Sequence, residues 1–148
     1  MEIVLLKDNL QYFDEVLQLS EREWEGLFSK EKWIALLTPY KYGDKISSCF
    51  LAIEKNELLG FATIREKVHN IPHLSPWLFI LYVKEQHRKK GIGRKLIEKV
   101  EDLARELGYR TIYLGTEDKA EYYKKLNWTE LEPLNVNGIR VVLMKKNL

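Results

Sequence analysis

The segment from Leu78 to Leu96, LFILYVKEQHRKKGIGRKL, constrains the fold more than any other part of the chain. An apolar run leads into a basic stretch with two closely spaced glycines, and a helix with one apolar face follows. This order predicts an anion site, because the first turn of a helix offers free backbone N–H groups and the positive end of its dipole. Glycine also lets a phosphate approach the backbone closely. The segment therefore predicts binding of a phosphorylated ligand.

The positive charge of the chain is concentrated in this same segment. The formal net charge is only +2, and hydrophobic and charged residues make up 45% and 31% of the sequence, the proportions of an ordinary globular protein. The clustered cations are Lys84, Arg88, Lys89, Lys90, Arg94 and Lys95. A near-neutral chain with one basic cluster favours a discrete anion site over a surface that coats a polyanion. We therefore expect no nucleic-acid partner.

The other bulk features predict a single cytoplasmic domain over residues 1–148. Cys49 is the only cysteine, which excludes a disulfide framework and a thiolate zinc cluster. The first residues, MEIVLLKDN, lack the charged region and the long apolar run of a signal peptide. No segment approaches the roughly 20 apolar residues that a membrane span needs. We expect no membrane partner.

Hydrophobic periodicity divides the chain into strands and helices. Strands are expected at residues 2–6, 46–54, 58–66, 77–83, 111–114, 129–134 and 139–145. Helices are expected at 10–17, 24–28, 93–107 and 119–126, while residues 33–37 either extend the second helix or form another turn. Antiparallel hairpins would then flank a central strand–helix–strand crossover. The predicted fold class is α/β (α+β), with a mixed, mostly antiparallel sheet of about six to seven strands flanked by helices.

Two of these elements carry strong signals. Residues 77–83 are apolar at every position, as expected of a strand covered on both faces. The helix at 93–107 has a charged face and one apolar stripe, formed by Leu96, Ile97, Val100, Leu103, Ala104 and Leu107. Gly108 follows where a C-cap glycine belongs, and Asn137-Gly138 predicts a two-residue hairpin turn.

Two motifs resemble those of the GNAT superfamily of acetyl-CoA-dependent N-acetyltransferases. Residues 88–93, RKKGIG, fit the pattern Arg/Gln-x-x-Gly-x-Gly/Ala between a buried strand and an amphipathic helix. Residues 123–128, YKKLNW, look like the family's Tyr-x-Lys-Leu-Gly-Phe segment, with Asn127 in place of the glycine; Asn tolerates a left-handed conformation. The strand order also agrees, so the resemblance covers essentially the whole chain. A dinucleotide fingerprint would need glycine at Leu96, and no Walker sequence is present.

The resemblance implies acetyl-CoA as cosubstrate, and from the residues themselves we expect no metal. The backbone of residues 89–94 would hold the coenzyme diphosphate, basic side chains nearby would add charge, and the main chain of residues 81–83 would pair with the pantetheine amides. Thr116 stands where a coenzyme-contacting asparagine is common in the family. The implied coenzyme-binding residues are Leu81, Tyr82, Val83, Arg88, Lys89, Lys90, Gly91, Ile92, Gly93, Arg94, Thr116 and Tyr123.

The resemblance also places Tyr123 as the acid that protonates the departing thiolate. Tyr122 precedes it, but adjacent positions on a helix point about 100° apart, so only one of the two can face the sulfur. Deprotonating the attacking amine costs roughly 4.6 kcal/mol at pH 7 for a lysine-type amine and about 1 kcal/mol for an α-amine. Glu66 is the predicted catalytic base, with His73 as the other candidate. His69 and His73 have a ligand-like spacing, yet Pro72 lies between them and nothing completes a metal site.

The predicted function is transfer of the acetyl group of acetyl-CoA to a primary amine of a small molecule or peptide, by direct attack in a ternary complex. One alternative is a noncatalytic acyl-CoA-binding or regulatory module on the same fold, and another is nucleic-acid binding through residues 84–95. Carboxylates beside aromatic rings suit a cationic amine, although the same residues fit a core and a solvated helix face. These residues are Glu21, Glu23, Trp24, Glu25, Trp33, Tyr40 and Tyr42. The expected state is a monomer or homodimer.

Overall fold

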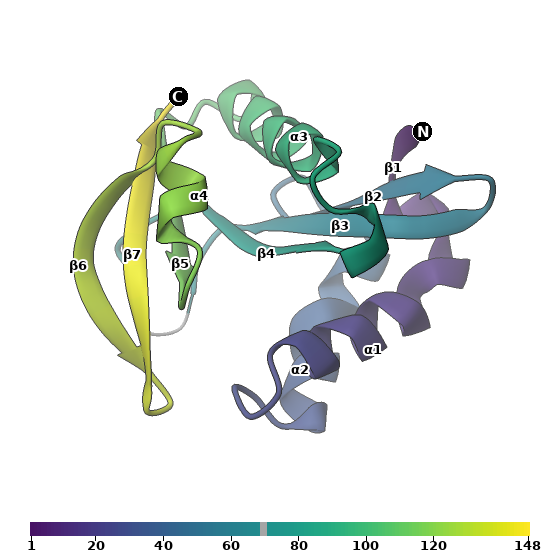
Figure 1. Ribbon diagram of the computed structural model, residues 1–148, viewed down its shortest axis with the longest axis horizontal. Helices are drawn as coiled ribbons and strands as arrows, with labels where there is room; N and C mark the ends of the chain where they lie inside the picture. Colours follow the sequence, from purple (N-terminus) through teal and green to yellow (C-terminus); the bar gives the residue numbers. More distant parts are fainter. Residues whose placement is uncertain (69–70) are drawn as a thin grey trace.

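The computed structural model describes residues 1–68 and 71–148, which form a seven-stranded sheet in the order β1-β2-β3-β4-β5-β7-β6 with helices on both faces (Figure 1). The strands are β1 (Glu2–Leu5), β2 (Ser48–Glu54), β3 (Glu57–Arg65), β4 (Trp77–Val83), β5 (Thr111–Thr116), β6 (Thr129–Val136) and β7 (Ile139–Asn147). The α-helices are α1 (Phe13–Glu23), α2 (Lys30–Leu37), α3 (Ile92–Glu106) and α4 (Ala120–Lys124). Short 3₁₀ turns are η1 (Leu6–Asp8), η2 (Leu10–Tyr12), η3 (Thr38–Lys41) and η4 (Glu85–His87).

The predicted fold class is confirmed. Over the described ranges every neighbouring pair of strands is antiparallel except β4 and β5, which α3 joins as the predicted crossover. Both hairpin turns use left-handed residues, as a tight turn between twisted strands requires. Lys55 and Asn56 have φ of 51° and 62° between β2 and β3, and Asn137 and Gly138 have φ of 50° and 84° between β6 and β7.

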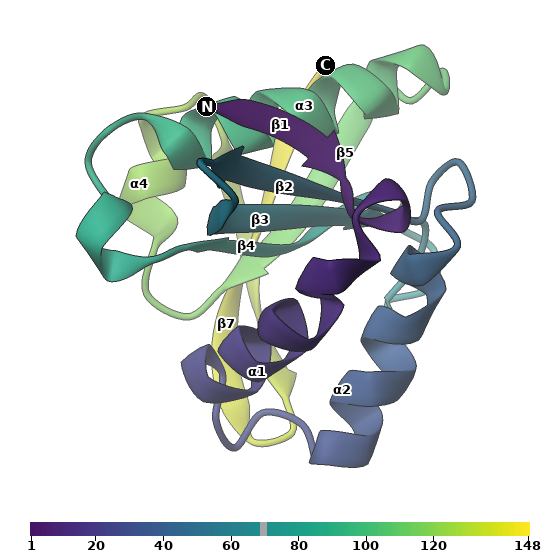
Figure 2. The ribbon, with the colours of Figure 1, turned by 90° about the vertical axis from the view of Figure 1, so that its right-hand side faces the viewer.

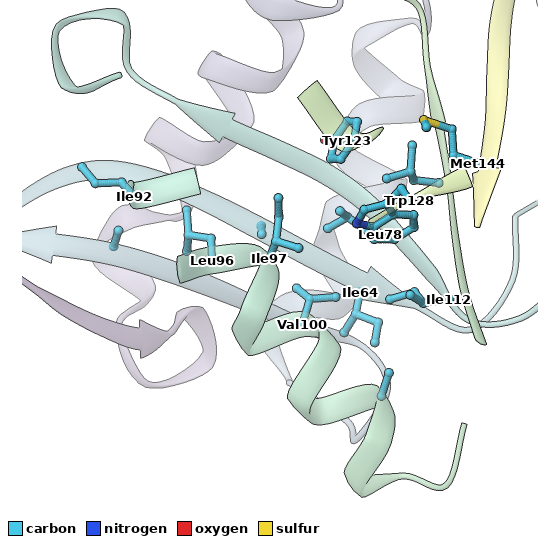
Figure 3. Packing of buried hydrophobic residues seen from close by; sticks show 14 of the residues in the cluster. Ile64, Leu78, Ile92, Leu96, Ile97, Val100, Ile112, Tyr123, Trp128 and Met144 are labelled. Carbon is cyan, nitrogen blue, oxygen red and sulfur yellow. The ribbon is translucent and has the colours of Figure 1, made fainter. Parts of the chain in front are cut away.

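Helix α3 packs on one face of the sheet through its apolar stripe (Figure 3). Leu96, Val100 and Ala104 are completely buried in the core between α3 and the strands, and Leu103 is partly buried at its edge. The sixth predicted member, Leu107, does not belong to the stripe because its side chain is 37% exposed. The helix ends there: Gly108, at φ 92°, turns the chain toward β5.

Helices α1 and α2 cover the opposite face of strands β1 to β4 (Figure 2). The predicted helix at residues 24–28 is wrong: this segment is a turn, and Gly26 has φ 86°. The second helix begins only at Lys30, after Ser29, whose hydroxyl accepts a hydrogen bond from the Lys32 N–H at 3.1 Å. Ser at the N-cap satisfies one of the free donors of the first turn, which fixes where α2 starts.

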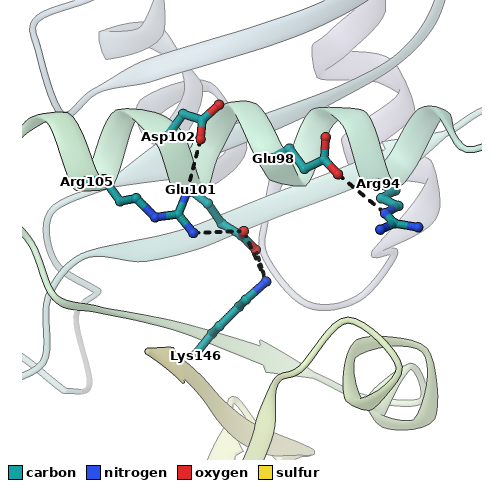
Figure 4. Close-up of polar contacts among 6 residues, drawn as sticks. All are labelled: Arg94, Glu98, Glu101, Asp102, Arg105 and Lys146. Atoms are coloured by element: carbon teal, nitrogen blue, oxygen red, sulfur yellow. Dashed lines mark hydrogen bonds and ion pairs between the residues drawn. The ribbon is translucent and has the colours of Figure 1, made fainter. Parts of the chain in front are cut away.

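A buried ion pair fastens α3 to the last strand (Figure 4). Glu101 is 4% exposed, and Lys146 on β7 donates to both of its carboxylate oxygens at 3.1 Å. Arg105, one turn further along α3, lies 3.8 Å from the same carboxylate. The helix is therefore held in register with both halves of the sheet. None of the helices in the described ranges has the length and apolar character to cross a membrane.

Candidate active site

Strands β4 and β5 meet at one end and then diverge (Figure 1). Among the described residues their only register pair joins Trp77 to Tyr113, where the Tyr113 N–H donates to the Pro76 carbonyl at 3.0 Å. Within residues 1–68 and 71–148, no strand pairs with the β5-facing edge of β4 beyond Trp77. Both faces of this half of β4 are nevertheless covered, as predicted: Leu81 and Val83 pack against the core beneath α3, and Tyr82 packs against the core beneath α1 and α2, although all three are only partly buried.

A groove of about 1300 Å³ occupies the space that this divergence opens. Its walls come from β4, from the end of β5 and the start of α4, from the α1–α2 connection and from the β6–β7 hairpin. Residues of these walls include Trp24, Phe28, Trp33, Arg65, Lys67, Phe79, Ile80, Leu81, Leu114, Thr116, Tyr123 and Asn137. The groove is thus a product of the sheet topology and is lined by segments far apart in the sequence.

The glycine loop lies between the end of β4 and the start of α3, as predicted. Gly91, at φ 81°, is the N-cap of α3, and no side chain caps the helix. A Cβ built on Gly91 would meet nothing within 4 Å, so the space above the loop is open. Lys89, at φ 64°, and Lys90 are exposed beside it. An uncapped helix N-terminus with open space and two adjacent cations is suited to an anion such as a diphosphate.

The other basic residues of the loop have specific contacts. Arg88 donates from Nε to the Val83 carbonyl at 2.7 Å, so its guanidinium braces the end of β4. The Val83 carbonyl consequently already has a donor. Arg94 is exposed on the first turn of α3 and lies 3.4 Å from Glu98 (Figure 4). Ile92 is buried, so only its backbone can face a ligand at the loop.

Leu81 lines the groove, but Tyr82 points to the other side of β4, where its ring lies 5.6 Å from that of Phe61. Thr116 is buried and lines the groove, and its hydroxyl accepts a hydrogen bond from the Lys119 N–H at 3.0 Å. That hydroxyl helps to start α4.

Tyr123 lies on α4 and lines the groove, whereas Tyr122 does not. The Tyr123 ring packs edge-on against Trp128, with centroids 5.9 Å apart (Figure 3). It packs in the same way against Tyr122, at 5.2 Å. Burial raises the pKa of the Tyr123 hydroxyl, and the neighbouring Tyr122 raises it further. The hydroxyl therefore stays protonated at neutral pH, as a proton donor requires. Asn127, at φ 73°, makes the predicted left-handed turn between α4 and Trp128.

The predicted bases lie away from this groove. Glu66 and His73 are exposed and do not line it. His69 lies outside the described residues. Across residues 1–68 and 71–148 no group of three potential metal ligands is present.

Aromatic side chains form the wall contributed by the α1–α2 connection. The ring of Trp33 lies 6.1 Å from that of Trp24 and 5.2 Å from that of Phe28. Asn137, at the tip of the β6–β7 hairpin, donates from its side-chain amide to the Leu27 carbonyl at 3.0 Å. This hydrogen bond joins the hairpin to the connection across one end of the groove.

The charged residues of the groove are mostly ones that sequence reasoning missed. Of the predicted acceptor-binding glutamates, Glu23 lines the groove but Glu21 and Glu25 do not. Tyr40 is buried in the core, and Tyr42 is 76% exposed. The missed charges are Lys32, Arg65, Lys67, Glu117, Asp118 and Lys119. For Arg65 no local signal was available, because β3 is buried without interruption from Leu58 to Ile64, and Lys67 lies beyond the end of the strand.

The chain belongs to the acetyltransferase (GNAT) family, whose family model matches residues 13–128. The predicted family is therefore confirmed. Over 71 aligned residues the chain is 39% identical to the D-amino-acid N-acetyltransferase HPA3 of Saccharomyces cerevisiae, a match that covers 43% of this chain and 40% of that protein. The matched region thus spans less than half of the yeast relative.

Solved structures agree over nearly the whole chain. An aminoglycoside 6′-N-acetyltransferase complexed with coenzyme A superimposes with a TM-score of 0.78 at 22% identity, covering 99% of this chain and 97% of that one. Aminoglycoside 6′-acetyltransferase type Ii gives a TM-score of 0.72 at 28% identity, with the same coverage of 99% and 97%. The first of these likenesses, at its low identity, shows the fold alone.

Proposed function

We propose that this protein transfers the acetyl group of acetyl-CoA to a primary amine of a small molecule or peptide, by direct attack in a ternary complex. The observation that carries the proposal is the divergence of β4 from β5 after Trp77, which opens one groove lined by Leu81 and Tyr123. Family membership and the coenzyme-bound acetyltransferase of the same fold support it. A cytoplasmic location and a monomeric or homodimeric state stay predictions from the sequence.

The residues present fit the coenzyme. The uncapped N-terminus of α3 would bind the diphosphate, since its first-turn N–H groups have no side-chain cap and the space above Gly91 is open. Lys89 and Lys90 would add positive charge. The main chain of Leu81, on the open edge of β4, would pair with an amide of the pantetheine arm. Bound acetyl-CoA supplies the acetyl group as an activated thioester.

The proton transfers fall to side chains of the groove. Tyr123 would donate the proton that the departing thiolate needs, because burial keeps its hydroxyl protonated. The proton of the attacking amine needs an acceptor within the groove. Glu23, Glu117 and Asp118 line it, and they are better placed for this task than Glu66.

Calorimetric titration of the protein with acetyl-CoA tests the proposal, with ATP, NAD and a short DNA duplex as competing ligands. Gly91→Glu should abolish acetyl-CoA binding, because a carboxylate would enter the diphosphate site. Gly108→Glu is the matched control: both glycines have left-handed φ, of 81° and 92°, and open space around Cβ, but Gly108 lies at the far end of α3. Each substitution carries a similar backbone strain, of about 1 kcal/mol.

Selective binding of acetyl-CoA, lost in Gly91→Glu and kept in Gly108→Glu, followed by turnover of an amine, supports the proposal. Binding without turnover of any amine in a broad panel would favour the noncatalytic acyl-CoA-binding module. Absence of binding to the wild-type protein would refute the coenzyme site. Salt-sensitive binding of the DNA duplex that acetyl-CoA does not compete with would favour a nucleic-acid surface instead.

A further inference from the structure

Arg65 presents a guanidinium to the groove at the end opposite the glycine loop. It is the last residue of β3 and pairs in register with Trp77, the first residue of β4. Its guanidinium carbon lies 4.7 Å from the centroid of the Phe79 ring. The residue is half-buried, and both Arg65 and Lys67 line the groove. Stacking on an aromatic ring holds the planar guanidinium in place while leaving its N–H edge available.

Arg65 lies too far from the glycine loop to bind the coenzyme diphosphate there. The strand β4 has 7 residues, and at about 3.3 Å per residue Trp77 and Val83 lie about 20 Å apart. The loop that would bind the diphosphate follows Val83, whereas Arg65 stands beside Trp77. The positive charge of Arg65 and Lys67 in the groove is therefore separate from that of the glycine loop, which lies at the other end of β4.

The protein itself does not neutralise Arg65. Within residues 1–68 and 71–148, none of the ion pairs within 4 Å involves Arg65 or Lys67. Both side chains are cationic and offer only donors. A ligand that complements them must bring acceptors and negative charge, and the fork of an Arg side chain matches a carboxylate in a bidentate manner.

We propose that the acceptor is an amine that also carries a carboxylate, as an amino acid does, and that Arg65 binds this carboxylate. The inference rests on the proposed function and names the acceptor class for the same groove. The carboxylates that line the groove come from other walls: Glu23 from α1, and Glu117 and Asp118 from the β5–α4 connection. They are available to the acceptor's ammonium group. An acceptor with several ammonium groups and no anion would instead place like charges beside Arg65 and Lys67.

A matched set of acceptors tests this inference on the wild-type enzyme. Initial rates with acetyl-CoA are compared for phenylalanine (both enantiomers), phenylalanine amide and phenethylamine, which share an amine and an aromatic ring but differ in the carboxylate. We expect kcat/KM to be about 100-fold higher for at least one enantiomer of phenylalanine than for phenethylamine, with the amide close to phenethylamine. This factor is in the range for one desolvated bidentate ion pair.

Variants then assign the effect to Arg65. Arg65→Gln should raise the KM for phenylalanine at least tenfold more than the KM for phenethylamine, and Arg65→Lys should recover part of the difference. Arg110→Gln, an exposed cation outside the groove, is the control and should shift neither KM. Calorimetric affinity for acetyl-CoA is measured on every variant, because Arg65 lies far from the diphosphate loop and its loss should leave this affinity within twofold.

The outcomes separate the two proposals. Failure of the wild-type protein to bind acetyl-CoA refutes the proposed function. Acetylation of phenethylamine as efficiently as phenylalanine, or an equal effect of Arg65→Gln on both acceptors, overturns the role of Arg65 while the proposed function stands. Acetyl-CoA binding with turnover restricted to amines without a carboxylate, in a panel that includes D- and L-amino acids, overturns it as well.

Discussion

Replacing Tyr123 by phenylalanine separates the chemistry of the groove from its architecture. The change removes one hydroxyl and leaves the ring, which packs edge-on against Trp128 and Tyr122. No hydrogen bond of that hydroxyl to the described residues is lost. We therefore expect fold stability and acetyl-CoA affinity to change little. The expected loss is in the acetyl-transfer step.

The structure sets the size of that loss. A well-placed general acid contributes about 10²- to 10⁴-fold. Burial raises the pKa of Tyr123 above the usual value, which is about 10, while a thiol has a pKa of about 8.5. Proton transfer from Tyr123 to the thiolate is thus uphill, which places its contribution at the low end of the range. We expect Tyr123→Phe to slow the step about 100-fold, or about 2.7 kcal/mol.

Rapid-quench single turnover, with enzyme in excess over acetyl-CoA and a saturating amine, isolates this step from product release. Tyr122→Phe is the matched control on the same helix, since Tyr122 does not line the groove, and its rate should stay within twofold of wild type. Because the pKa of Tyr123 is raised, its hydroxyl stays protonated between pH 7 and 9, so its titration should produce no fall in the wild-type rate there. A Tyr123→Phe rate equal to that of wild type would remove Tyr123 from the role of acid.

Two further predictions concern the contacts that hold the groove. Lys146→Met leaves the buried Glu101 carboxylate with Arg105 alone, at 3.8 Å, and should lower the free energy of unfolding by about 3 kcal/mol in urea titration. Adding Glu101→Gln should recover most of the lost stability. Equal stability of Lys146→Met and wild type would contradict the role of the ion pair. Asn137→Asp keeps a residue that tolerates φ 50° but loses the amide donor to Leu27, worth about 1 kcal/mol. Amide exchange at residues 24–28 should quicken and the acceptor KM should rise, whereas unchanged exchange would show that the contact does not restrain the connection.

Local patterns predicted most of the fold because the elements that dominate it carry their own signals. The Asn137-Gly138 turn and the apolar stripe of α3 depend only on neighbouring residues. The helix expected at residues 24–28 failed for a physical reason: Trp24 and Phe28 recur at helical spacing and pack at the edge of the core, where they also line the groove, but the backbone between them is not helical. Gly26, at φ 86°, then turns the chain between them.

Sequence motifs located the glycine loop and Tyr123, but not the charged side chains at the Trp77 end of the groove. The glycine loop could be predicted from Gly91, because the left-handed backbone conformation at this position, with φ 81°, favours glycine. Arg65 gave no such signal. Strand β3 is buried from Leu58 to Ile64 without interruption, so its sequence lacks the alternation that would tell which side Arg65 or Glu66 faces. The side that Arg65 faces is determined by the register of β3 against β4, and this register depends on tertiary structure.

The proposed ligand contacts at the two ends of β4 are therefore of different kinds. At the Val83 end the proposed ligand contacts are backbone groups of a loop and a helix terminus, and Arg88 braces the strand through the Val83 carbonyl. Any sequence that keeps the loop conformation can keep this function. At the Trp77 end the contacts are side chains on separate walls, each of which can change without disturbing the sheet. Acceptor choice can consequently diverge while coenzyme binding is retained. The separation of about 20 Å along β4 means that an anionic acceptor at Arg65 would not compete with the coenzyme phosphates for the same cations.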